Sequence, residues 1–214
     1  MDFKKYTHYW IGGQEAKNGV RIIVQRNLEE YEEAVEYTSD RVMRIRLRTR
    51  IVVKDLIQVY APRTENKEEN IEDILEVLES ILTDVEATVM GDLNAQVGKE
   101  RLGKEEISGP YGYGRKNEEG EKLVDFCERN GLTVGNTWFR KKNSQKITRY
   151  GWGDRRTKTV IDYFLVEKKN RRQLTDVTAL PGEAFDGDHR VVVTKMRFDE
   201  LKDIKEERER IIKV

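Results

Sequence analysis

Disulfide-forming cysteines, long apolar runs and a signal segment are all missing from this sequence, and each absence excludes a class of protein. Cys127 is the single cysteine among 214 residues, so no intrachain disulfide can form, and a reducing compartment is favoured. It follows Phe126 in a helical pattern, which predicts a buried small apolar side chain rather than a nucleophile. No apolar run approaches membrane-spanning length, and the first five residues are not those of a signal peptide. We therefore expect an intracellular protein, nuclear or cytoplasmic, with no membrane association.

Net charge is also absent, because 40 basic residues balance 40 acidic ones. The balance is uneven along the chain: residues 61–130 carry 9 basic and 18 acidic side chains, whereas residues 131–198 carry 15 basic and 7 acidic ones. The basic part can face phosphates, or the asymmetry reflects solvated helices and loops; composition alone leaves both interpretations open.

Strand patterns dominate the two ends of the chain, and helical patterns occur between them. We expect strands at 6–11, 19–25, 41–50, 51–60, 87–90, 132–134, 146–150, 160–166, 176–180 and 190–198, and helices at 71–82 and 117–130. The unit from Leu56 to Asn94 reads as β-α-β. Residues 41–50 alternate apolar and arginine side chains, which predicts a basic sheet face that is solvated beside acidic neighbours or touches a nucleic-acid backbone. The fold class is α/β or α+β with at least two layers.

A single domain is expected over residues 1–198. The remaining residues, 199–214, form a charged amphipathic tail that reads as a terminal helix or a linker.

The stretch Gly91-Asp92-Leu93-Asn94 follows a short apolar strand and delivers a carboxylate and an amide at its end. Gly91 permits the close backbone approach found where a strand runs into a loop. Asp92 and Asn94 point the same way if the extended conformation continues. The alternative is an ordinary turn after a core strand.

Three further polar positions stand at or near the ends of apolar runs: Tyr60, Asp162 and the pair Asp188-His189. A carboxylate within an apolar strand needs a partner, and for Asp162 that partner is His189 or a nearby arginine, Arg155 or Arg156. An Asp162–His189 contact would set the tautomer of a catalytic imidazole. Each position also has a plain structural interpretation: a strand-end aromatic for Tyr60, an ion pair for Asp162, and a solvated turn at 186–188.

Taken together, these positions describe a site of carboxylates, one amide, one phenol and one imidazole. Oxygen ligands of this kind select Mg²⁺ or Mn²⁺ rather than zinc. The chemistry that such a set supports is hydrolysis by a water that a metal ion and a carboxylate activate.

The ordered motifs resemble the endonuclease/exonuclease/phosphatase superfamily, which includes DNase I and exonuclease III. They are Tyr60-Ala61-Pro62, Gly-Asp-Leu-Asn at 91–94, Ile-Asp-Tyr-Phe-Leu-Val at 161–166 and Gly-Asp-His at 187–189. Segments 111–120, 136–139 and 180–183 look more specifically like the apurinic-type endonuclease domain of RTE-clade non-LTR retrotransposons and the host sequences derived from them, the craniofacial development protein 2-like group. The resemblance runs from about Phe3 to Phe198.

The resemblance implies a four-layer α/β sandwich, two face-to-face sheets between helices, and a metal-dependent DNA endonuclease of retrotransposon origin. In that family pattern, Asp92 orients or deprotonates the attacking water and Asn94 hydrogen-bonds the water or the scissile phosphate. Tyr60 contacts that phosphate. Asp188, with Asp92, places the Mg²⁺ or Mn²⁺ or the water. His189 donates to the phosphoryl oxygen, and Asp162 orients His189.

Two departures from the family pattern carry expectations of their own. Relatives have earlier strands with an asparagine and a metal-binding glutamate; Gln14-Glu15 reads as a loop, so we expect this chain to lack those strands and to expose a sheet edge that favours self-association. The usual Ser-Asp-His is Gly187-Asp188-His189 here. The alternative functions are an inactive remnant that binds nucleic acid or protein, and a phosphatase acting on lipid or nucleotide phosphates.

Overall fold

A computed structural model describes residues 5–13, 18–49, 52–63, 70–83, 85–151, 156–184 and 187–197, apart from the side chains of 182–184. Several expectations fall outside the described residues: Gln14-Glu15, the pairing of Asp162 with Arg155, Asp186, and the tail 199–214. No helix in the described part of the chain is long and apolar enough to cross a membrane.

Six strands form the central sheet, in the order β3-β4-β5-β6-β10-β7. Their bounds are β3 Glu32–Ser39, β4 Val42–Arg48, β5 Val53–Tyr60, β6 Glu86–Asp92, β7 Leu132–Val134 and β10 Asp162–Glu167. β5 and β6 are parallel and are joined through helix α1 (Ile71–Ile81), as the β-α-β interpretation predicts, whereas β10 runs antiparallel to β6. The C-terminal ends of β5 and β6 therefore meet the N-terminal end of β10 at one end of the sheet.

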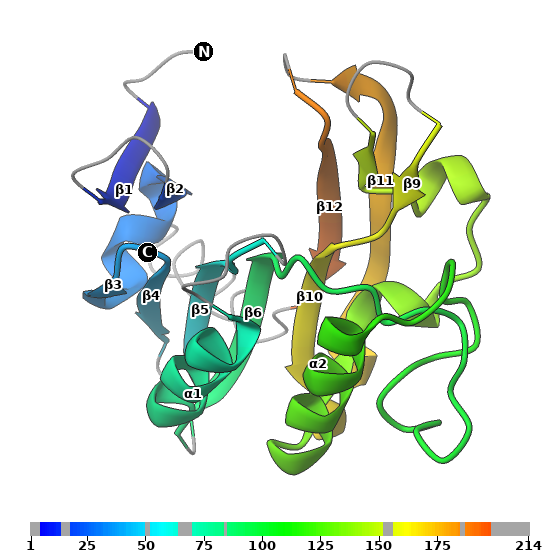
Figure 1. Ribbon diagram of the computed structural model, residues 1–214. Helices are drawn as coiled ribbons and strands as arrows, with labels where there is room; N and C mark the ends of the chain where they lie inside the picture. The colour runs from blue at the N-terminus through cyan, green and yellow to red at the C-terminus, as the bar shows by residue number, and fades with distance from the viewer. Residues whose placement is uncertain are drawn as a thin grey trace, which may run out of the picture.

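Helices α1 and α2 (Glu118–Arg129) cover one face of this sheet (Figure 1). Each begins at an asparagine whose side chain accepts a backbone N–H of the first turn: Asn70 caps α1, and Asn117 caps α2. Their apolar stripes bury Leu78 and Phe126 completely against the sheet. Cys127 lies in this core, where burial raises the pKa of its thiol, so the predicted packing role is confirmed.

Two antiparallel ribbons pack against the opposite face. They are β1 (Tyr6–Gly12) with β2 (Gly19–Gln25), and β11 (Leu174–Ala184) with β12 (Arg190–Met196). The first packs Ile22 against Met43 and Ile45 of β4, and the second packs Leu174 against Val166 of β10. Figure 1 shows the two ribbons at opposite sides of the molecule, and within the described ranges β2 pairs only with β1 and β12 only with β11.

The remaining elements are short. They are the ribbon of β8 (Arg149–Tyr150) and β9 (Lys158–Thr159) and the 3₁₀ helices η2 (Arg26–Tyr31), η3 (Gly135–Trp138), η4 (Asn143–Gln145) and η5 (Lys168–Gln173). The α/β expectation is confirmed, and the described residues supply three layers: helices, central sheet and ribbons.

The sequence pattern missed strand β3, and it placed Arg44 of β4 on a solvated face where the structure buries it. Glu32–Ser39 is rich in glutamate and lacks apolar alternation, so only its pairing with β4 makes it a strand. Arg44 is buried rather than solvated: it contacts Glu36, Asp55 and the Ile81 carbonyl that ends α1. Arg44 thus holds β4 to the end of α1, and neither predicted role of a basic outer face applies to it. Arg48 is largely exposed and pairs with Glu33, as expected for a solvated arginine beside acidic neighbours.

Candidate active site

Three of the predicted polar residues stand in one row across adjacent strands. Tyr60 closes β5, Asp92 closes β6, and Asp162 opens β10. In the strand register, Tyr60 is the partner of Asp92 and Asp92 is the partner of Asp162. Asp162 is therefore the first residue of its strand and not, as the apolar pattern from Val160 suggested, an interior one. Directly opposed residues of an antiparallel pair share a face, so the two carboxylates are neighbours.

Gly91 is required where β6 delivers Asp92. Its φ of 142° belongs to a region that side chains rarely adopt, and a Cβ there would stand 1.9 Å from the carbonyl oxygen of Val59. The close backbone approach predicted from the sequence is confirmed. A larger residue would push β6 away from β5 and move the carboxylate of Asp92.

His189 and Asp188 reach the same place from the ribbon layer, immediately before β12. The segment 148–150 holds them there: the Tyr150 N–H donates to the Asp188 carbonyl at 2.8 Å, and the Arg190 N–H donates to the Thr148 carbonyl at 2.7 Å. These contacts thereby place Asp188 and His189, almost 100 positions after Asp92 in the sequence, beside the end of the central sheet where Asp92 lies.

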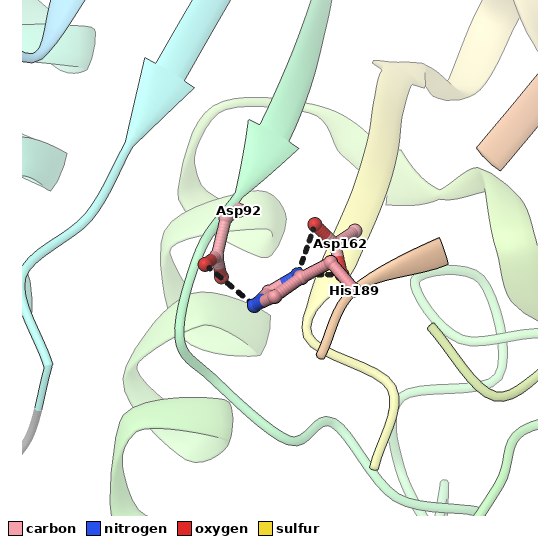
Figure 2. A group of neighbouring side chains, drawn as sticks. All are labelled: Asp92, Asp162 and His189. Carbon is pink, nitrogen blue, oxygen red and sulfur yellow. Dashed lines mark hydrogen bonds and ion pairs between the residues drawn. The ribbon is translucent and has the colours of Figure 1, made fainter. Parts of the chain in front are cut away.

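The imidazole of His189 lies between two carboxylates (Figure 2). Its Nδ1 is 3.1 Å and 3.2 Å from the two carboxylate oxygens of Asp162. Its Nε2 is 3.7 Å from Oδ2 of Asp92 and 3.9 Å from Oδ1 of Asp188. The contact of Asp162 with His189 that the sequence suggested is present, and it leaves Nε2 directed at Asp92.

This packing shifts the proton affinities of the site in different directions. Burial, and then the nearby charge of Asp162, raise the pKa of Asp92 to about 6. For His189, burial works to lower the pKa, but Asp162, Asp92 and Asp188 outweigh it and the pKa is raised. Burial would likewise raise the pKa of Asp188, but Arg149 lowers it. Asp92 therefore takes up a proton more readily than an ordinary aspartate, and Asp188 less readily. The imidazole of His189 is more readily protonated than an ordinary histidine.

Asn94 does not sit as strand geometry predicts. The strand ends at Asp92, and Asn94 has a positive φ of 46°, so the two side chains are not related by a two-residue strand repeat. Instead the Asn94 N–H donates to Oδ1 of Asp92 at 2.9 Å, and its side-chain amide donates to the Ala61 carbonyl at 2.8 Å. Asn94 thus ties the end of β6 to the end of β5 and holds the Asp92 carboxylate.

Tyr60 is half-buried, and its side chain has a neighbour that the sequence did not predict. The guanidinium of Arg41 lies 5.2 Å from the centre of its ring. Its backbone joins Asp92 through the strand register, so Tyr60 borders the site.

Three residues that the motif analysis did not select complete the site. Arg149 donates from Nε to Oδ2 of Asp188 at 2.7 Å. Thr148 is fully buried, and its hydroxyl accepts the N–H groups of Ile161 and Asp162 at 3.1 Å and 3.2 Å. Asn136 donates to the Asp162 carbonyl at 3.0 Å. A polar residue inside an expected strand was the only signal for Thr148, and Asn136 stood in a segment noted for its resemblance alone.

The donor atoms suit a divalent cation. Asp92, Asp162 and His189 each offer one ligand atom, and these atoms lie within 4.8 Å of one another. Asp188 is outside that group, but Oδ1 remains beside the imidazole while Oδ2 binds Arg149. Mg²⁺ is commonly held by one or two carboxylates and several waters, so these residues fit such an ion.

Comparisons with known proteins agree with the motifs. No protein-family model matches the chain. Craniofacial development protein 2 from Tragulus javanicus and from Bos taurus are each 29% identical to it over 198 residues, which are 89% of the chain. The match takes in 33% and 32% of those proteins, so the chain spans about a third of their length.

Solved structures share the fold. The endonuclease domain of TRAS1, a telomere-specific non-LTR retrotransposon, superposes with a TM-score of 0.64 at 13% identity, covering 90% of this chain and 79% of that domain. An AP endonuclease from Archaeoglobus fulgidus gives 0.64 at 17% identity, with 90% and 80% covered. A 3′-5′ exonuclease from Neisseria meningitidis gives 0.66 at 17% identity, with 92% and 81% covered. The chain therefore has the endonuclease/exonuclease/phosphatase fold, and the resemblance drawn from its motifs is confirmed.

Proposed function

We propose that this chain is a divalent-metal-dependent phosphodiesterase that cleaves DNA. The observation that carries the proposal is the imidazole of His189, held by Asp162 through Nδ1 and facing Asp92 and Asp188 through Nε2. The similarity of its fold to that of nucleases, one of which was solved as a 3′ phosphatase bound to a product DNA hairpin, supports DNA as the substrate.

Asp92 orients and deprotonates the attacking water. A general base works best when its pKa is near the working pH, and the pKa of Asp92 is raised to about 6. Its Oδ1 is already held by the Asn94 N–H, so the other oxygen is the one that takes the proton. Asn94 is proposed to contact the water or the scissile phosphate as well, and Tyr60 to contact that phosphate from the neighbouring strand end.

His189 donates to the phosphoryl oxygen as negative charge develops on it. Asp162 fixes the ring and favours its protonated form, which places a charged donor on the Nε2 side. The cost of reaching the transition state lies in bringing a nucleophile to a centre that is already negative, so a fixed cationic donor lowers it.

Asp92 and Asp188 are the residues that we propose to hold Mg²⁺ or Mn²⁺. Such an ion, when bound, neutralises charge on the phosphate and lowers the pKa of a bound water. Arg149 keeps Asp188 ionised, which preserves its ability to act as an oxygen ligand.

Nicking of supercoiled plasmid tests the proposal. The expected result is cleavage in Mg²⁺ or Mn²⁺ that EDTA and Asp92→Ala both abolish. Cutting that survives Asp92→Ala would discard the assignment, since it would come from another site or a contaminant. A parallel panel of a phosphodiester oligonucleotide, a 3′-phosphorylated oligonucleotide and a soluble inositol phosphate separates a nuclease from a phosphatase.

A further inference from the structure

A small hollow lies beside the candidate active site and is lined by polar, aromatic and aliphatic side chains, the last being Val97, Val160, Val177 and Ala179. Its walls include Tyr111 and Tyr113 of a loop, Asn136 and Thr137 of η3, and Lys141 and Lys146 on either side of η4. It has room for a group of about the size of one or two water molecules, which is too little for a nucleobase but enough for the free oxygens of a phosphate.

The hollow and the candidate active site share a wall. Asn136 lines the hollow, and its side chain spans the backbone of β10 at the site: its Nδ2 donates to the Asp162 carbonyl and its Oδ1 accepts the Phe164 N–H, both at 3.0 Å. Lys146 lies three residues before Arg149, which binds Asp188. Three residues span at most about 10 Å of chain, and the helical backbone conformation of Lys146 shortens that distance, so a strand of nucleic acid bound at His189 passes close to the hollow.

The two lysines of the hollow differ in their partners. The ammonium of Lys141 pairs with Asp176 at 2.6 Å, and Asp176 also accepts the Thr178 hydroxyl, so that carboxylate is already engaged. Lys146 is half-buried, and no hydrogen bond or ion pair of its ammonium is found within the part of the chain that the structure describes. Burial lowers the pKa of Lys146, as expected for a cation that has lost water without gaining a carboxylate.

We infer that this hollow is an anion subsite, in which Lys146 binds the phosphate one nucleotide away from the scissile bond. The inference rests on the proposed function for the identity of the anion. A phosphate supplies the negative charge that Lys146 lacks, and Tyr111, Tyr113 and Gln145 of the same lining carry groups that can donate further hydrogen bonds to it. The subsite sets the register of the strand, so that the scissile phosphate comes to rest beside His189 and Asp92.

Binding in EDTA tests the subsite without requiring cleavage. The full chain is titrated with a fluorescent 20-base-pair DNA duplex at several salt concentrations, and the slope of log affinity against log salt is compared between variants. Lys146→Gln is expected to weaken binding about 3- to 10-fold at moderate salt and to reduce the magnitude of the slope by about 0.9, the value for one phosphate contact. Lys146→Arg, which keeps the charge, is expected to retain the wild-type slope and shows that a loss is not one of folding.

Lys142→Gln is the matched control. This exposed lysine of the same segment does not line the hollow, so its removal takes away the same charge outside the subsite. Equal effects of the two glutamine variants, or no binding of the duplex by the wild-type chain, would overturn the inference.

Duplexes with one neutral methylphosphonate linkage locate the contact. The penalty of Lys146→Gln is expected to vanish when the linkage replaces one particular phosphate and to persist at every other position. The proposed function and the subsite fail in different ways. If Lys146→Gln weakens DNA binding as expected but the protein shows no metal-dependent nicking, only the proposed nuclease function is wrong. If nicking occurs but Lys146→Gln does not weaken binding, only the proposed subsite is wrong.

Discussion

Asp92 and Asp162 stand directly opposite each other on strands β6 and β10, and the imidazole of His189 lies between their carboxylates. Partial burial and then repulsion by the neighbouring Asp162 carboxylate raise the pKa of Asp92 to about 6. The neighbouring carboxylates that suit the proposed hydrolysis therefore lower the free energy of unfolding at neutral pH.

Asp92→Asn is expected to stabilise the protein at neutral pH while removing activity. The pKa of Asp92 is higher in the folded state than the ordinary value of about 3.9, so its contribution to stability is fully present below about pH 4 and is lost as the pH rises through 6. Asparagine keeps the acceptor for the Asn94 N–H and removes the charge. We expect thermal unfolding at pH 8 to rise by about 3–6 °C, with no such gain at pH 4.

Glu79→Gln is the control for that measurement, because Glu79 is an exposed carboxylate of α1. Its melting temperature should follow the wild type at both pH values. A melting temperature of Asp92→Asn below the wild type at pH 8 would mean that the Asp92 charge stabilises the fold.

Asp162→Asn is expected to lower the pKa of His189, because it removes the neighbouring carboxylate that raises it most. The pKa of His189 is raised because neighbouring carboxylates favour its charged form against the effect of burial, and Asp162 is the first of them. NMR titration of the imidazole measures this directly, since the sequence has only two histidines and His189→Gln assigns the signal. An unchanged titration midpoint would mean that Asp162 does not set the charge of the ring.

Thr148→Val is expected to destabilise the fold by about 1–3 kcal/mol and to reduce cleavage further than the stability loss explains. The buried hydroxyl accepts two N–H groups, those of Ile161 and Asp162, and valine leaves both unpaired at the start of β10. Urea denaturation and plasmid nicking measure the two effects. Thr148→Ser keeps the hydroxyl and should preserve activity; equal losses in both variants would assign the effect to the methyl group.

Gly91→Ala is expected to cost about 3 kcal/mol or more, because its Cβ would collide with the Val59 carbonyl. Gly114 also has a positive φ, 73°, but a Cβ there meets nothing within 4 Å. Gly114→Ala should therefore cost only the conformational penalty of about 1–2 kcal/mol. Denaturant unfolding of the two variants separates steric collision from backbone strain, and equal costs would contradict the collision.

Calorimetry with Mg²⁺ and Mn²⁺ is expected to reveal millimolar or tighter binding. Asp92→Ala and Asp188→Asn should each weaken it about 10-fold or more, because each removes one charged oxygen ligand. Glu79→Gln, which changes an exposed carboxylate far from these residues in the sequence, should leave it unchanged. Affinity that is the same in all four proteins would place the ion elsewhere.

Local patterns in the sequence were sufficient for most of the fold. Helical spacing located both helices, and a β-α-β reading located the parallel pair β5 and β6. A helix depends on contacts between residues close in the chain, and a strand-helix-strand order favours a parallel crossover, which is why a pattern reveals both. Strand β3 was missed because its glutamates interrupt any apolar alternation, and the pairing with β4 makes it a strand.

The candidate site divides along the same line. The sequence alone determined which chemical groups the chain offers and that Asp92 ends a strand after a required glycine. Only the tertiary structure decided how they meet: strand register sets Asp162 beside Asp92, and the segment 148–150 brings His189 to them from another layer. The tertiary structure also decided that Asn94 ties the end of β6 to the end of β5, and that Arg149 binds Asp188. A residue with a positive φ and an ion pair between distant residues leave no periodic signal in a sequence.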